Sequence, residues 1–282
     1  MKSILLIAAA ALFTVSIVGQ GALQKLVETE RSFAALAREK GTKHAFLEYT
    51  APDGILFLPD RIKAIDYWNA RNESQELLSW APNYADVSSN EMIGYTTGNW
   101  EYRAKEKDDA PTGFGEFVTI WQRMPDGNYK FIVDIGIGHE KPAQFSTAVA
   151  PPAYPPSANE KNSSAADSAN SFFEIAGRTG LSKAYDTFAA GEVRAFREGN
   201  MPMIGKNRLI SYAKSRKSRM IFMRRSSSFG SADIAYISST YTETKDVGGG
   251  VEKGNFVQIW KLIDGRWKIV LDIFKPIPEK QG

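Results

Sequence analysis

The sequence predicts an α+β protein built from two copies of one domain, each with helices packed on one face of a curved antiparallel sheet. Three observations support this prediction. The stretch GEFVTIWQRMPDGNYKFIVDIG, which begins at Gly115, returns as GNFVQIWKLIDGRWKIVLDIF from Gly254. Within each copy, helical spacing of apolar residues comes first and strand-type patterns follow. A segment rich in Pro, Ser and Ala separates the copies.

The repeat extends over a whole domain length. Sliding the chain against itself by about 139 positions brings separated stretches into register in the same order. The matched pairs are Phe33 with Phe172, Gly41 with Gly180, Tyr95 with Tyr236, Trp100 with Tyr241, Trp121 with Trp260, and Asp134 with Asp272. We therefore expect a signal peptide over residues 1–21, a first domain over 22–140, an extended linker over 141–164 and a degenerate second domain over 165–282.

The elements of the first copy follow in order. Leu26, Phe33 and Ala37 recur at helical spacing, and Gly41 is the type of residue that ends a helix. The sequence then predicts a short helix over 44–50, a strand over 55–58 and a third helix over 62–71, which corresponds to 207–218 in the second copy. Strands over 92–105, 115–124 and 128–137 complete the copy, with a turn at Pro125-Asp126-Gly127.

The N-terminus has the pattern of a secretory signal peptide. Lys2 precedes an uncharged apolar run from Ile4 to Val18, and the small residues Gly19 and Gly21 suit cleavage before Ala22. The run is short for a membrane span, so an uncleaved anchor is the weaker alternative. We expect a periplasmic or extracellular protein that has no integral membrane segment after cleavage.

Composition excludes several classes of function. The chain has 282 residues, of which 43% are hydrophobic and 24% charged, and its formal net charge of +3 does not indicate a nucleic-acid partner. The absence of cysteine excludes disulfides and thiolate chemistry, and two histidines are too few for a histidine-rich metal centre. We expect no metal and no cofactor.

The order of elements, with a hairpin that closes on Asp-Gly, an aromatic residue and a late aspartate, resembles the cone-shaped nuclear-transport-factor-like superfamily. That superfamily includes SnoaL-like and ketosteroid-isomerase-like proteins, and the resemblance is closest to its small exported members of unknown function. It implies a deep, mostly apolar pocket at the mouth of each cone. The fold alone does not decide the function, because members include isomerases, cyclases, dehydratases and binding modules.

The resemblance argues against ketosteroid isomerase activity. That chemistry needs a carboxylate base in the first strand, where this chain has Leu58 and, in the second copy, Arg197. The first helix has no tyrosine for the oxyanion, and Thr119 or Gln258 lies near the position of the protonated acid. SnoaL-like cyclases resemble this chain more closely in having an acid in the last strand, which here is Asp134 or Asp272.

Asp134 and His139 are the candidate catalytic residues. Asp134 lies among Ile and Val in the last strand, where burial raises the pKa of a carboxyl and makes it a usable acid or base. The alternative is a structural aspartate, which its recurrence as Asp272 favours. His139 lies five residues further on, on the opposite face of an extended strand, so direct pairing with Asp134 is not expected. A bulge or bend at Gly136 or Gly138 would let His139 fold over the mouth of the pocket, and the alternative is an exposed histidine at a domain edge.

A second group of candidates belongs to the first copy. The set consists of aromatic and polar residues suited to a flat apolar or sugar-like ligand: Trp80, Asp86, Tyr95, Thr97 and Trp100. The sequence thus favours a secreted tandem protein that binds a small apolar or aromatic molecule in its N-terminal pocket. Two alternatives stay open: a cofactor-independent isomerase, cyclase or dehydratase that uses Asp134, and a structural or protein-binding module. Exposed sheet faces also allow a homodimer or pairing of the two domains.

Overall fold

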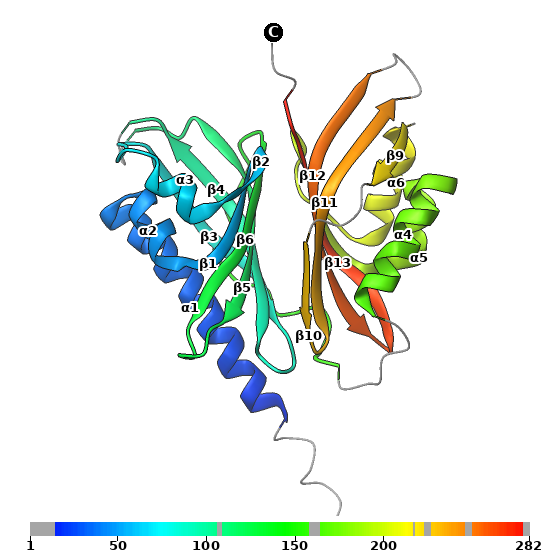
Figure 1. Ribbon diagram of the computed structural model, residues 1–282, viewed down its shortest axis with the longest axis horizontal. Helices are drawn as coiled ribbons and strands as arrows, with labels where there is room; N and C mark the ends of the chain where they lie inside the picture. The colour runs from blue at the N-terminus through cyan, green and yellow to red at the C-terminus, as the bar shows by residue number, and fades with distance from the viewer. Residues whose placement is uncertain are drawn as a thin grey trace, which may run out of the picture.

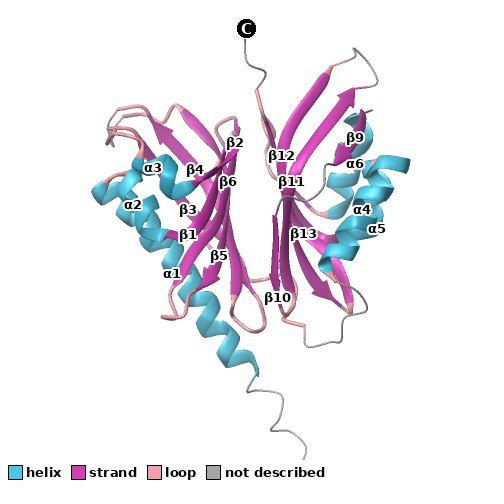
Figure 2. Cartoon of the chain, viewed as in Figure 1, coloured by secondary structure: helices cyan, strands magenta, loops and turns pink. Residues whose placement is uncertain are grey.

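The computed structural model describes residues 15–105, 109–157, 164–216, 218–222, 227–245 and 250–278. Two curved sheets stand face to face in the middle of the molecule, and the helices cover their outer sides (Figures 1 and 2). We call the first sheet with α1–α3 the first domain, and the second sheet with α4–α6 the second domain. The predicted α+β class is confirmed.

The first domain begins with helices and ends with a run of hairpins. Its sheet has the order β2-β1-β6-β5-β4-β3. The elements are α1 (Val15–Lys40), α2 (Thr42–Tyr49), β1 (Thr50–Leu58), β2 (Asp60–Lys63), α3 (Ala64–Asn69), β3 (Leu77–Val87), β4 (Ile93–Arg103), β5 (Gly113–Arg123) and β6 (Tyr129–His139).

The second domain repeats this arrangement. Its sheet has the order β10-β11-β12-β13-β7-β8, and β9 also pairs with β11. The elements are α4 (Ala165–Thr179), α5 (Leu181–Phe188), β7 (Ala189–Arg197), β8 (Met203–Ile204), α6 (Lys206–Arg216), β9 (Ser218–Phe222), β10 (Ser227–Ser231), β11 (Ile234–Lys245), β12 (Val251–Ile263) and β13 (Arg266–Pro276).

Two details differ from the sequence prediction. The sheets are mixed rather than wholly antiparallel, because β1 runs parallel to β6 and β7 runs parallel to β13. The third helix of the first domain is shorter than predicted, since residues 60–63 form β2 and the helix occupies only Ala64–Asn69. The Asp60–Lys63 segment pairs with the end of β1, and this pairing outweighs its helical pattern.

The helices close one side of each sheet. Leu26, Phe33 and Ala37 of α1 are fully buried against the sheet, as their spacing predicts. Gly41 separates α1 from α2 with a φ of 91°, a left-handed conformation that favours glycine, and Gly180 repeats it with a φ of 94°.

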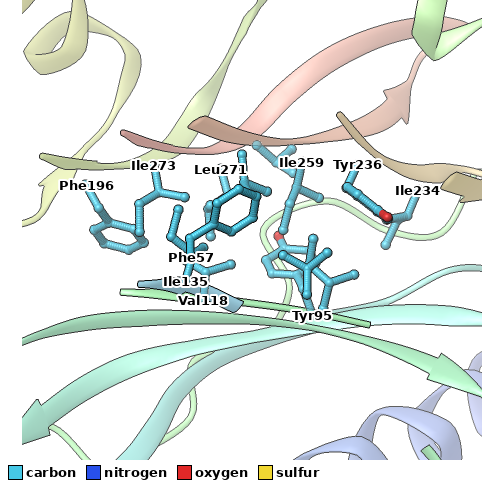
Figure 3. Close-up of a cluster of buried hydrophobic side chains, with 14 of the residues drawn as sticks. Phe57, Tyr95, Val118, Ile135, Phe196, Ile234, Tyr236, Ile259, Leu271 and Ile273 are labelled. Carbon is cyan, nitrogen blue, oxygen red and sulfur yellow. The ribbon is translucent and has the colours of Figure 1, made fainter. Parts of the chain in front are cut away.

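A single apolar layer joins the two sheets. Side chains from both domains interdigitate between the sheets (Figure 3). Members from the first domain include Phe57, Tyr95, Val118 and Ile135, and members from the second include Phe196, Ile234, Tyr236, Ile259, Leu271 and Ile273. Each sheet is therefore covered on both faces, by helices on one side and by the other sheet on the opposite side.

Polar contacts also cross this layer. Lys261 Nζ lies 2.7 Å from Asp86 Oδ2 and 3.9 Å from Asp233 Oδ2, and all three side chains are buried. Asn90 Nδ2 donates to Ser231 Oγ at 2.5 Å. Because an ion pair away from water is costly to break by removing one partner, these contacts hold the two sheets in one arrangement.

The described part of the segment between the domains is docked on the protein. Ala150 forms a bridge with Tyr84, and its N–H donates to Asn83 O at 2.9 Å. Further along, the N–H of Ser157 donates to Asp233 Oδ2 at 2.9 Å. Hydrogen bonds from their backbone N–H groups thus attach Ala150 and Ser157 of the predicted extended linker to the two domains.

The predicted signal peptide lies mostly outside the described residues, which begin at Val15. From there α1 continues without a break through Gly21 and Ala22, where cleavage is predicted. Among the described residues, no helix combines the length and apolar composition needed to cross a membrane.

Candidate functional site

The first domain contains a cavity of about 280 Å³ between its helices and the helix-facing side of its sheet. Apolar and aromatic side chains form most of its wall. They include Phe46, Leu56, Leu58, Trp68, Trp100 and Phe117. Exposed charged residues such as Arg71, Glu73 and Glu76 lie at its entrance. This combination of an apolar wall and a few polar groups is typical of small-molecule sites, and the volume is at their small end.

Asp134 is the acid of this cavity. It lies in β6 opposite Thr119 of β5, whose hydroxyl donates to its Oδ2 at 2.8 Å. Its neighbours Val133 and Ile135 point the other way, into the layer between the sheets. Burial raises the pKa of Asp134 to about 6, against the opposing effects of the Thr119 hydroxyl and Lys275. Both protonation states of the carboxyl are therefore accessible near neutral pH.

The second domain shows what neutralises such an acid. Asp272, the counterpart of Asp134, is fully buried and forms an ion pair with Arg197. It also accepts from the Tyr185 hydroxyl at 2.7 Å and from Gln258 Nε2 at 2.9 Å. The corresponding cavity in this domain has a volume of only about 50 Å³, and Tyr185 and Arg197 line it.

The first domain lacks these partners. By the repeat, Leu58 stands where the second domain has Arg197, and Phe46 stands where it has Tyr185. Thr119 stands in place of Gln258 and donates the one hydrogen bond that the described residues give to the Asp134 carboxyl. The space that the arginine fills in one domain is thus cavity in the other.

A second buried acid lies behind this wall. Glu30 of α1 is fully buried, and Trp80 Nε1 donates to its Oε1 at 2.6 Å. Thr96 Oγ1 and Trp121 Nε1 donate to its Oε2 at 2.5 and 3.2 Å. Burial raises the pKa of Glu30 to about 7, and the nearby Asp134 adds to the shift.

Glu30 is not among the predicted site residues, although the sequence contains a signal for it. Leu26, Glu30, Phe33 and Ala37 share one helical face, so a glutamate interrupts an otherwise apolar stripe. In the second domain the counterpart of Glu30 is Ala169. The three residues that donate hydrogen bonds to Glu30 also have counterparts in the second domain: Phe222 for Trp80, Ile237 for Thr96 and Trp260 for Trp121. Trp260 keeps its indole, but its buried Nε1 has no hydrogen-bond partner among the described residues.

The structure brings only part of the predicted set together. Asp134 and Trp100 line the cavity. Trp80 does not line it. Its indole N–H donates to Glu30, and its ring packs on Phe33 with centroids 4.7 Å apart.

Three further candidates lie on the other face of the sheet. Tyr95 belongs to the apolar layer between the sheets, and Asp86 pairs with Lys261 there. Thr97 is buried and donates to Phe117 O at 2.5 Å. Successive side chains of a strand point to opposite faces, so Tyr95 and Thr97 cannot share the cavity with Trp100. The structure therefore places Asp86, Tyr95 and Thr97 away from the cavity that Trp100 lines, and does not bring the predicted set together.

His139 also lies away from the cavity. Its Nε2 is 3.5 Å from Glu116 Oε1, and both side chains are buried. The Glu116 partner raises the pKa of His139. The histidine and Asp134 occupy opposite faces of β6, so the structure offers no direct pairing of the two. Among the described residues there is no group of three His, Asp or Glu side chains placed to hold a metal ion.

Neither a protein-family model nor a curated protein sequence matches this chain. Solved structures similar to it include a ketosteroid isomerase-like protein from Erwinia carotovora atroseptica, with 18% identity, a TM-score of 0.36, and coverage of 40% of this chain and 92% of the other. A putative SnoaL-like polyketide cyclase from Jannaschia sp. has 13% identity and a TM-score of 0.31, and the match covers 39% of this chain and 83% of the other. An NTF2-like protein from Cytophaga hutchinsonii has 13% identity, a TM-score of 0.34, and coverage of 39% and 93%.

Proposed function

We propose that the cavity of the first domain binds a small, largely apolar molecule, and that the Asp134 carboxyl is its main polar contact. One observation carries the proposal. In the second domain Arg197 neutralises Asp272, whereas the first domain has Leu58 at the corresponding position, so Asp134 lies beside an open cavity. A carboxyl with one hydrogen-bond donor retains acceptor capacity, which a hydroxyl or amine of a ligand can use.

Leu58→Arg tests this proposal, because it gives the first domain the arginine of the second. The new guanidinium should reach Asp134 and fill the cavity, as Arg197 does beside Asp272. The probe is N-phenyl-1-naphthylamine, an uncharged aromatic amine that fluoresces in apolar surroundings. We expect Leu58→Arg to weaken its binding by about tenfold or more, which corresponds to about 1.4 kcal/mol.

Leu58→Met is the matched control, since it keeps an apolar side chain of similar size. It should bind the probe as the unmodified protein does. Leu58 is 44% exposed, so both substitutions are compatible with folding. Equal probe binding by Leu58→Arg and Leu58→Met would contradict the assignment of the cavity as the binding site.

A second candidate function is supported by the raised pKa of Asp134. A carboxyl with a pKa of about 6 beside an apolar cavity can remove or return a proton, as a cofactor-independent isomerase, cyclase or dehydratase requires. Exchange of α-protons for deuterium in small ketones and keto acids, followed by NMR, measures this activity. Exchange that persists unchanged in Asp134→Asn would exclude Asp134 as the base.

We also propose that the protein is exported to the periplasm or the cell exterior. The charged start, the apolar run and the small residues near Gly21 support this. Cleavage before Ala22 would remove only the first part of α1 and would keep Leu26, which is fully buried. Cell fractionation with N-terminal sequencing tests the proposal, and an intact Met1 in the cytosolic fraction would overturn it.

A further inference from the structure

One residue that lines the first domain's cavity comes from the second domain. Lys275, near the end of β13, lines the cavity beside Asp134 and Gly136. Its Nζ donates to Gly136 O at 2.5 Å. Asn255, its partner across the strands, donates from Nδ2 to Pro59 O at 2.6 Å. These two bonds hold this end of the second sheet against the first domain at the cavity.

The ammonium of Lys275 retains hydrogen-bonding capacity. An ammonium has three donors, and Gly136 O takes one of them. Among the described residues no carboxylate forms an ion pair with Lys275, although Asp134 and Glu198 act on it at longer range. Burial lowers the pKa of Lys275, and the opposing effects of Glu198 and Asp134 are smaller, so its environment disfavours the charged form.

The fold itself does not require a lysine here. The counterpart of Lys275 in the first domain is Ile137, which is fully buried in the layer between the sheets. Both residues occupy the same register, because Ile137 pairs with Glu116 and Lys275 with Asn255. An apolar side chain is therefore compatible with this position, whereas a half-buried ammonium costs free energy unless an anion compensates it.

We propose that Lys275 is the anion-binding group of the first domain's cavity, and that the ligand is a small apolar molecule carrying a carboxylate or a similar single negative group. This inference rests on the proposed function, since it names the class of molecule for the same cavity. The aromatic wall takes the apolar body of the ligand, and Lys275 takes its charged end. The second domain, whose own cavity is filled by Arg197, thereby contributes directly to binding.

Two probes that differ by one charge test the proposal on the full chain. N-Phenyl-1-naphthylamine is neutral, and 8-anilinonaphthalene-1-sulfonate has the same aromatic body with an added sulfonate. The anionic probe should bind more tightly than the neutral one. Lys275→Met should weaken the anionic probe about tenfold or more and leave the neutral probe within about twofold. Lys275→Arg should retain the preference for the anion.

Lys268→Met is the matched control. Lys268 lies in the same strand and also donates to a backbone carbonyl, Thr187 O, at 2.7 Å, but it does not line the cavity. It should leave both probes unaffected. If Lys268→Met weakens the anionic probe as much as Lys275→Met does, the effect is one of overall charge and the proposal is wrong.

The remaining outcomes separate the two proposals. If the neutral probe does not bind, or binds Leu58→Arg unchanged, the proposed function itself fails and this inference fails with it. If the neutral probe binds and responds to Leu58→Arg, but Lys275→Met weakens both probes equally or neither, the cavity stands and the anion site is overturned.

Discussion

Asp134→Asn and Asp272→Asn remove the same carboxylate from equivalent positions, and we expect opposite effects on stability. Burial raises the pKa of Asp134 from its ordinary value of 3.8 to about 6. The folded state thus binds this proton more tightly than the unfolded chain. The resulting stabilisation is fully present below about pH 4 and is lost as the pH rises through 6. At about 1.4 kcal/mol per pKa unit, the ionised carboxylate costs roughly 3 kcal/mol above pH 7.

An asparagine side chain at this position has no such cost and can still accept from Thr119. We therefore expect Asp134→Asn to raise the free energy of unfolding by up to about 3 kcal/mol at pH 8, and by less than about 1 kcal/mol at pH 4. Asp272→Asn leaves Arg197 buried without its counter-charge, which costs about 3–5 kcal/mol. Lost interactions with Tyr185 add to that loss.

Urea unfolding of both variants at pH 8 and pH 4, followed by circular dichroism, measures these differences. The unmodified protein provides the reference at each pH. Two results would refute this reasoning: equal destabilisation by the two substitutions, or a gain in unfolding free energy for Asp134→Asn that does not shrink at pH 4. Either would show that the ion pair of Asp272 with Arg197 does not distinguish the two aspartates.

Two further predictions concern buried polar groups. Trp121→Phe and Trp260→Phe lose the same volume, but only Trp121 donates hydrogen bonds, to Glu30 and Thr96. In urea unfolding, Trp121→Phe should lower the free energy of unfolding by about 1–3 kcal/mol more than Trp260→Phe does. A larger loss for Trp260→Phe would contradict the finding that its indole N–H has no hydrogen-bond partner among the described residues. Lys261→Met should destabilise the protein by about 3–5 kcal/mol at pH 8, because it leaves Asp86 buried and unpaired. Since the pKa of Asp86 is already about 6, the loss should shrink at pH 5, and thermal unfolding that shows no such pH dependence would argue against the ion pair.

The repeat and its hairpins could be predicted because local constraints recur in both copies. A Cβ at Gly115 would overlap the Trp100 ring, and a Cβ at Gly254 would overlap the Tyr241 ring. Each aromatic residue pairs directly with its glycine across the strands. Backbone carbonyl oxygens of Ile137 and Lys275 lie similarly close to these positions, so the ring and the neighbouring strand together require the glycine that opens each matched hairpin.

The packing of the two sheets could not be predicted from the pattern. The stretch FIVDIGI of β6 is apolar at nearly every position, which indicates burial on both faces but does not identify what covers each face. The structure supplies the helices on one side and the second domain on the other. Composition likewise predicts an extended linker between the domains but not the hydrogen bonds of Ala150 and Ser157.

The site could be predicted in part. Asp134 was recognisable as an acid in an apolar strand, and Trp100 as an aromatic residue without a matched tryptophan. The stretch GYTTGNWE places Tyr95 and Thr97 close to Trp100 in sequence, but strand alternation puts them on the opposite face of the sheet. The contribution of Lys275 depends on how the two domains pack, and a single sequence does not determine that packing.

The two domains pack face to face like the subunits of a dimer, but their cavities can differ, which the cavities of two identical chains cannot. β6 lies against its own counterpart β13, and β4 lies against its counterpart β11, as in a symmetric dimer. In a dimer of identical chains, every substitution appears in both subunits. An arginine that filled one cavity would fill both, and a lysine that lined the partner's cavity would do so in each subunit. Because the two halves here belong to one polypeptide, Arg197 and Lys275 each occur once. One half can therefore close its own cavity and serve the open cavity of the other.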